Sequence, residues 1–94
     1  MSTLDIIATK IIKEQELIIG PMAWLQAEKV TGLHIKDKKS GEVTIENDNA
    51  KSIVDNLVGQ YEHLFGRASR EVCKEAAAGL LAELSPAEVP ISLQ

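Results

Sequence analysis

The chain passes abruptly from one helical pattern to another at Gly20-Pro21. Glycine tolerates the positive φ that follows many helix ends, and proline suits the first turn of a helix because its missing N–H needs no partner there. Apolar residues recur at helical spacing on both sides of the break. We therefore expect a helix–corner–helix unit with helices over about residues 3–19 and 21–30, the first capped by Ser2 with Asp5.

The same layout returns 46 positions later, where Gly66 separates expected helices over about residues 49–65 and 67–84. A shift of 46 residues places Ile7 on Ile53 and Ile11 on Leu57, so the apolar phase of the two longer helices matches. Residue identity does not match, and the similarity fades beyond the corner. The sequence thus leaves open whether the chain holds a true repeat or two similar helix pairs.

The apolar period changes from 3.6 to 2 between the two units. Leu33 and Ile35, and later Val43 and Ile45, alternate with polar residues, which predicts two strands joined by a turn over residues 37–41. An isolated hairpin is marginal in water, so it must lie on the helices or pair with a second sheet, for example across a homodimer.

These elements predict a mainly helical α+β fold in the order α-α-β-β-α-α, with two helix–corner–helix pairs flanking a β-hairpin. Residues 1–84 form the expected single domain, and residues 85–94 an extended or disordered C-terminal tail. Three finer expectations concern packing. The second helix should bury Met22, Leu25 and Ala27, Gln15 should snorkel or bond locally, and Gly59 suits a close approach of another helix.

Composition narrows the classes of function. The net charge is −4 and the 94 residues include three aromatic ones, which argues against general nucleic-acid binding, because phosphate backbones attract clustered cations. No apolar run approaches the roughly 20 residues that span a bilayer, and the N-terminus lacks a signal-peptide pattern. The lone Cys73 excludes an internal disulfide. We expect a cytoplasmic protein without membrane contact.

Residues that could carry chemistry are scattered. A zinc site needs four ligands at short spacings, whereas His34, His63 and Cys73 occur singly, and Cys73 falls on an expected buried face. Glu71 lies among basic residues that predict a solvated helix face, and no glycine-rich phosphate loop is present. We therefore expect no catalytic residue, no bound metal and no cofactor.

The residues Ile19-Gly20-Pro21-Met22-Ala23, preceded by an apolar helix and a Glu, carry a family resemblance. Over about 20 residues the chain resembles the Ile-Gly-Pro-Ile-Ala corner of small helical modules that are appended to bacterial signalling proteins, such as cyanobacterial kinases and response regulators. The hairpin is not part of that pattern. The resemblance implies a protein-interaction or regulatory role without catalytic residues.

Two candidate binding surfaces follow. The first is a protein-partner surface of a self-associating regulatory module, made by Met22, Trp24, Leu33 and Ile35. Trp24 is either an anchor that closes the core or a partner contact. The alternative surface binds nucleic acid or another anion through basic residues of the hairpin tip and of the last helix, namely Lys36, Lys38, Lys39, Arg67 and Arg70. Solubility lysines on an exposed hairpin would give the same pattern.

Overall fold

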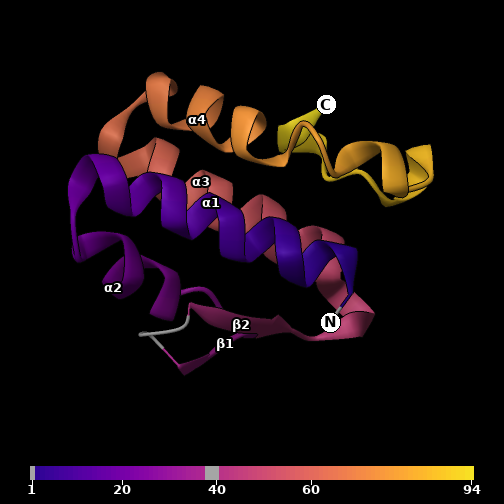
Figure 1. Cartoon of the computed structure of the whole chain (residues 1–94), viewed down its shortest axis with the longest axis horizontal. Helices are drawn as coiled ribbons and strands as arrows, with labels where there is room; N and C mark the ends of the chain where they lie inside the picture. The colour runs from indigo at the N-terminus through magenta and orange to yellow at the C-terminus, as the bar shows by residue number, and fades with distance from the viewer. Residues whose placement is uncertain (1, 38–40) are drawn as a thin grey trace.

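The computed structural model describes residues 2–37 and 41–94, and it has the predicted order α-α-β-β-α-α (Figure 1). The elements are α1 (Thr3–Ile19), α2 (Met22–Glu28), β1 (Leu33–Asp37), β2 (Glu42–Ile45), α3 (Ala50–Phe65) and α4 (Arg67–Ala77), followed by short 3-10 turns. In Figure 1, α1 lies across the middle with α3 behind it, α4 on one side and the β-hairpin on the other. The predicted fold class is confirmed.

Both corners have the same backbone geometry. Gly20 has φ 71° and ψ −155°, and Gly66 has φ 87° and ψ −177°, a region that is essentially restricted to glycine. The amide of each glycine donates to the carbonyl four residues earlier, Glu16 at 2.9 Å and Glu62 at 2.8 Å. The predicted helix ends are therefore fixed by backbone conformation.

The glutamates before the two corners also reach equivalent residues across them. The Glu16 carboxylate accepts a hydrogen bond from the Trp24 indole N–H at 2.7 Å. The Glu62 carboxylate lies 3.9 Å from the Arg70 guanidinium, again eight residues further along the chain. Each corner thus has a side-chain contact that ties the long helix to the short one.

The two helix pairs also bond to each other reciprocally. The Gln15 amide on α1 donates to the carbonyl of Ser69 at 3.0 Å, and the Tyr61 hydroxyl on α3 donates to the carbonyl of Ala23 at 2.7 Å. The donors are 46 residues apart, and so are the acceptors. The offset seen in the sequence therefore recurs as equivalent tertiary contacts. The expectation for Gln15 was wrong, because this side chain is buried and bonds to another helix.

The core lies between α1, α3 and the elements that cover them. Its members include matched apolar side chains of the two long helices: Ile7, Ile11, Ile12, Ile53, Leu57 and Val58. In α2 the buried side consists of Ala23, Trp24, Gln26 and Ala27. The prediction that Met22 and Leu25 are buried was wrong. Ala23, Trp24 and Ala27 occupy the inward side of this short helix, so Met22 and Leu25 fall on its outward side.

The β-hairpin packs on the helices, so it needs no second sheet. Leu33 pairs with Ile45 and Ile35 with Val43, and the register shifts between Ile35 and Asp37. The Asp5 carboxylate, which forms the predicted capping box with Ser2, also accepts the amide of Ile45 at 2.9 Å. The predicted turn over residues 37–41 lies partly outside the described residues.

The C-terminal segment differs from its prediction. Helix α4 ends at Ala77 instead of continuing to residue 84, because the chain turns at Ala78 and Gly79. Residues 85–94 are neither extended nor disordered. They form 3-10 turns. The Asp55 carboxylate of α3 accepts hydrogen bonds from the Ser92 amide at 2.9 Å and from the Ser92 hydroxyl at 2.7 Å. Leu93 is 2% exposed, so this segment belongs to the domain.

Replacing either corner glycine by alanine should destabilise the fold. A Cβ at Gly20 or Gly66 meets no atom within 4 Å, so the whole effect comes from the backbone conformation and should be about 1–3 kcal/mol. Gly59 is the matched control. It lies within α3, a Cβ there also meets no atom within 4 Å, and the predicted close approach is therefore absent. Gly59→Ala should raise stability by up to about 1 kcal/mol in urea unfolding. Equal gains at all three positions would contradict this account.

Candidate interaction surface

The four residues of the predicted partner surface do not share one exposed face. Trp24 and Leu33 are buried, with 5% and 6% of their surfaces exposed, and Ile35 is half-buried. Of the two interpretations of Trp24, the structure supports the core anchor, with the indole N–H held by Glu16. Met22 is 45% exposed and is the member of the set that offers a large contact area.

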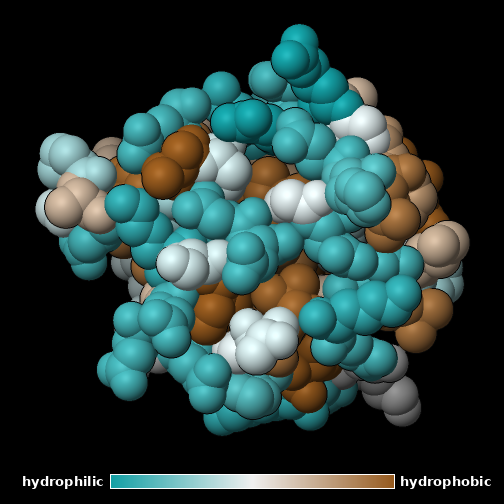
Figure 2. Space-filling view, turned by 180° about the vertical axis from the view of Figure 1, so that it is seen from behind, coloured by the Kyte–Doolittle hydropathy of each residue, from teal (hydrophilic) through white to brown (hydrophobic). Residues whose placement is uncertain are grey.

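Exposed apolar side chains instead gather at the end of the molecule where both corners lie. Among the described residues, six large apolar side chains are exposed, and five of them come from the C-terminal ends of α1 and α3 and from α2. We call this group the corner patch: Leu17, Ile18, Met22, Leu25 and Leu64, which are 45–80% exposed. Figure 2 shows apolar side chains crowded on this side, at the right of the view. The sixth, Ile91, lies in the last turn of the chain.

The corner patch arises because both long helices continue their apolar stripes up to the corner. Ile18 and Leu64 occupy equivalent positions, two residues before Gly20 and Gly66. Both side chains are nevertheless exposed, Ile18 at 63% and Leu64 at 46%. The apolar period alone does not reveal this, because it does not show how far the neighbouring elements cover the ends of the two helices.

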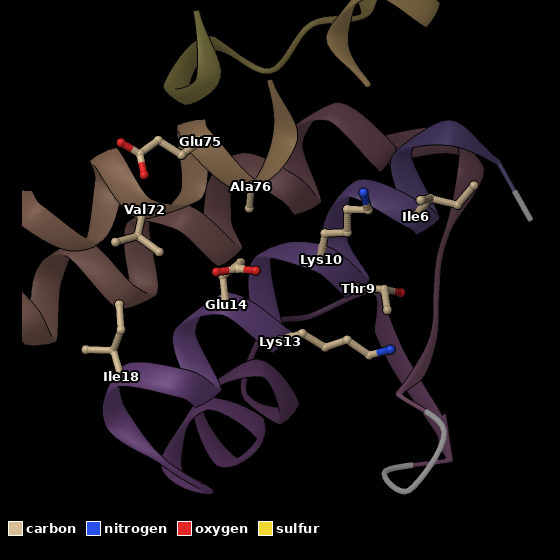
Figure 3. A pocket seen from close by; sticks show the side chains of 9 residues that line it. All are labelled: Ile6, Thr9, Lys10, Lys13, Glu14, Ile18, Val72, Glu75 and Ala76. Atoms are coloured by element: carbon tan, nitrogen blue, oxygen red, sulfur yellow. The ribbon is translucent and has the colours of Figure 1, made fainter. Parts of the chain in front are cut away.

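A groove of about 830 Å³ runs between α1 and α4 and includes Ile18 of the corner patch. Figure 3 shows Ile18 and Glu14 of α1 opposite Val72 and Ala76 of α4, with Lys10 and Ile6 further along α1. Lys10 and Glu14 are exposed, and neither has an ion-pair or hydrogen-bond partner among residues 2–37 and 41–94. The groove thus combines apolar side chains with two cations, Lys10 and Lys13, and two anions, Glu14 and Glu75.

A smaller groove of about 390 Å³ lies at the equivalent place, between α3 and residues 29–31, which follow α2. Asn56 and Gln60 stand where the first groove has Lys10 and Glu14, at the same offset of 46 residues. Gln60 donates to the side-chain oxygen of Gln26 at 2.8 Å. The second groove therefore has the same location in its half of the fold, but the positions equivalent to Lys10 and Glu14 are uncharged, and its charged lining residues are Lys29 and Asp55.

The structure does not assemble the predicted basic surface from the residues that it describes. The hairpin that carries Lys36 and the helix α4 that carries Arg67 and Arg70 lie on opposite sides of α1 (Figure 1). Arg70 is also engaged, since it pairs with Glu62 and donates to the carbonyl of Ser92 at 3.4 Å. Lys38 and Lys39 of this prediction lie outside the described residues.

The residues that could carry chemistry have ordinary environments. His34, His63 and Glu71 are exposed, whereas Cys73 is buried and accepts a hydrogen bond from the Gln15 amide at 3.4 Å. Burial raises the pKa of the Cys73 thiol to about 11, and burial likewise raises the pKa of Tyr61. A thiol with a raised pKa is a poor nucleophile. Across the described part of the chain, no group of three or more His, Cys, Asp or Glu side chains is placed to hold a metal ion.

Comparison with models of known protein families, with curated proteins and with solved structures found no match to this chain. None of the helices within residues 2–37 and 41–94 is both long enough and apolar enough to cross a membrane.

Stability should fall at alkaline pH through Cys73. The thiol ionises near pH 9 in the unfolded chain and near pH 11 in the folded one, so its contribution is complete below pH 9 and is lost as the pH rises towards 11. Linkage gives a loss of about 1 kcal/mol at pH 10. Urea unfolding between about pH 8 and pH 10 should show a steeper decline for the wild type than for Cys73→Ala. Parallel declines would show that the thiol ionises equally in both states.

Proposed function

We propose that this chain is a small, non-catalytic protein-interaction module of a regulatory kind, which binds a partner protein through the corner patch and also self-associates. The observation that carries the proposal is the concentration of Leu17, Met22, Leu25 and Leu64 at one end of the fold. Single exposed apolar residues are ordinary on protein surfaces, whereas a group of them marks an interaction site.

The backbone beneath the corner patch favours binding because it is already ordered. The restricted glycine conformations and the contacts of Glu16 with Trp24 and of Glu62 with Arg70 hold the ends of the helices in place. A preformed surface loses little conformational entropy on association. Full burial of one leucine contributes about 1.5–3 kcal/mol, so a few such side chains are enough for a specific complex.

The biological setting that we propose follows from the sequence. The segment Ile19–Ala23, which resembles the corner of helical modules in bacterial signalling proteins, supplies Met22 of the corner patch. We therefore propose a bacterial-type regulatory role. The proposed location is the cytoplasm, where a free thiol such as Cys73 is ordinary.

A charge placed in the corner patch should abolish partner binding without unfolding the protein. Proteins retained from a cell extract by the immobilised wild type would be identified, purified and titrated back by calorimetry. Leu25→Glu should weaken that reconstituted binding at least about tenfold, because a buried leucine contact is replaced by a desolvated carboxylate.

Ile91→Glu is the matched control, since Ile91 is 65% exposed but lies outside the corner patch, compared with 51% for Leu25. The control should bind as the wild type does, and urea unfolding should show both variants folded. Equal binding by Leu25→Glu and the wild type would refute the proposed surface.

A further inference from the structure

Four residues of α1 form a ridge that is complementary, in apolar character and in charge, to the same ridge running in the opposite direction. Ile6, Lys10, Glu14 and Ile18 recur every four residues and line the α1–α4 groove (Figure 3). Read in chain order they are apolar, basic, acidic and apolar. When a second copy runs antiparallel, Ile6 meets Ile18 of that copy, and Lys10 meets its Glu14. Every position of the ridge then faces a complementary one.

Helix packing rules make this pairing geometrically feasible. Ridges formed by residues four apart interdigitate when two helices cross at about −50°, the most common packing class in globular proteins. The two helices then cross midway between Lys10 and Glu14 along the helix axis, a point that is equally distant from Ile6 and Ile18. An axis at that point relates the two copies by a two-fold rotation, so the contact closes on itself as a dimer.

We propose that a second copy of this chain docks in the α1–α4 groove, with α1 of one copy antiparallel to α1 of the other. This inference rests on the self-association included in the proposed function and names its surface. Val72 and Ala76 of α4 provide an apolar seat beside the ridge, and Glu75 adds a carboxylate on the same side of the groove. The ridge of each copy thus enters the groove of the other.

The charges of the ridge are available for this contact. Lys10 precedes Glu14 by four residues, which is the weaker order for an ion pair within one helix. Neither side chain has a hydrogen-bond or ion-pair partner within the described ranges 2–37 and 41–94. Between two copies the same residues form two opposite-charge contacts per dimer, both in the middle of the ridge between the contacts of Ile6 with Ile18, where screening is reduced.

The equivalent ridge on α3 lacks this property. A shift of 46 residues replaces Ile6, Lys10 and Glu14 by Ser52, Asn56 and Gln60, so one apolar end and both charges are missing. Helix α3 therefore provides an internal reference of the same shape without the charge complementarity. The closed dimer leaves Met22, Leu25 and Leu64 of each copy free for the partner protein.

Charge reversal on the ridge tests the proposal by sedimentation velocity at low salt. Lys10→Glu and Glu14→Lys should each raise the dimer dissociation constant at least about tenfold, because each turns two attractive contacts into repulsive ones. An equimolar mixture of the two variants should recover the affinity of the wild type as a heterodimer, since all contacts are then opposite in charge. The doubly exchanged chain, Lys10→Glu with Glu14→Lys, should dimerise as the wild type does.

Asn56→Glu and Gln60→Lys are the matched controls on α3, and they should leave the dissociation constant unchanged within about threefold. If every ridge variant dimerises as tightly as the wild type, the proposed ridge contact is refuted, and self-association uses another face. A wild type that stays monomeric up to about 1 mM would overturn both, while partner binding through Leu25 would still be tested separately.

Discussion

The structure depends on a backbone conformation that only glycine adopts readily, and it occurs at Gly20 and again at Gly66. At each site a long helix stops, the chain turns, and a short helix packs back against the core. A side chain at either position would strain this conformation by about 1–3 kcal/mol and so weaken the turn on which the packing of each helix pair depends. The interior contacts between α1 and α4, and between α3 and α2, exist because both turns are enforced locally.

The two pairs then hold each other by exchange of hydrogen bonds. Gln15 of the first pair reaches Ser69 of the second, and Tyr61 of the second reaches Ala23 of the first. Each bond gives a partner to a fully buried polar side chain of a long helix, the Gln15 amide or the Tyr61 hydroxyl. The result is a scaffold with two equivalent grooves. The two grooves differ on their outer ridges, where Lys10 and Glu14 of α1 correspond to Asn56 and Gln60 of α3.

Much of this fold could be read from the sequence because its signals are local. The corners, the capping box of Ser2 with Asp5 and the alternation in the hairpin strands each involve residues a few positions apart. The orientation of α2 could not be read, because Met22 and Leu25 are as apolar as the residues that are buried. The order of the C-terminal segment was missed for a different reason. Its anchor, Asp55, lies 37 residues before Ser92.

The candidate surfaces show the same limit. Ile18 and Leu64 continue the apolar stripes of their helices, so only the end points of neighbouring elements reveal that both are exposed. In the sequence, the ridge residues Ile6, Lys10, Glu14 and Ile18 lie four positions apart. The meaning of this spacing depends on the tertiary structure, which leaves this side of α1 open beside α4. Scaffold, open groove and self-complementary ridge together are the basis of the proposed two-fold dimer.

Disulfide trapping between the ends of the ridge tests this dimer most directly. Copies carrying Ile6→Cys would be mixed with copies carrying Ile18→Cys and oxidised mildly, while the buried Cys73 stays unreactive. The antiparallel arrangement predicts a linked heterodimer as the main product, because like positions lie roughly 18 Å apart along the helices. Disulfides do not bridge such distances without large movement. Linked homodimers in statistical proportion to the heterodimer would contradict the arrangement.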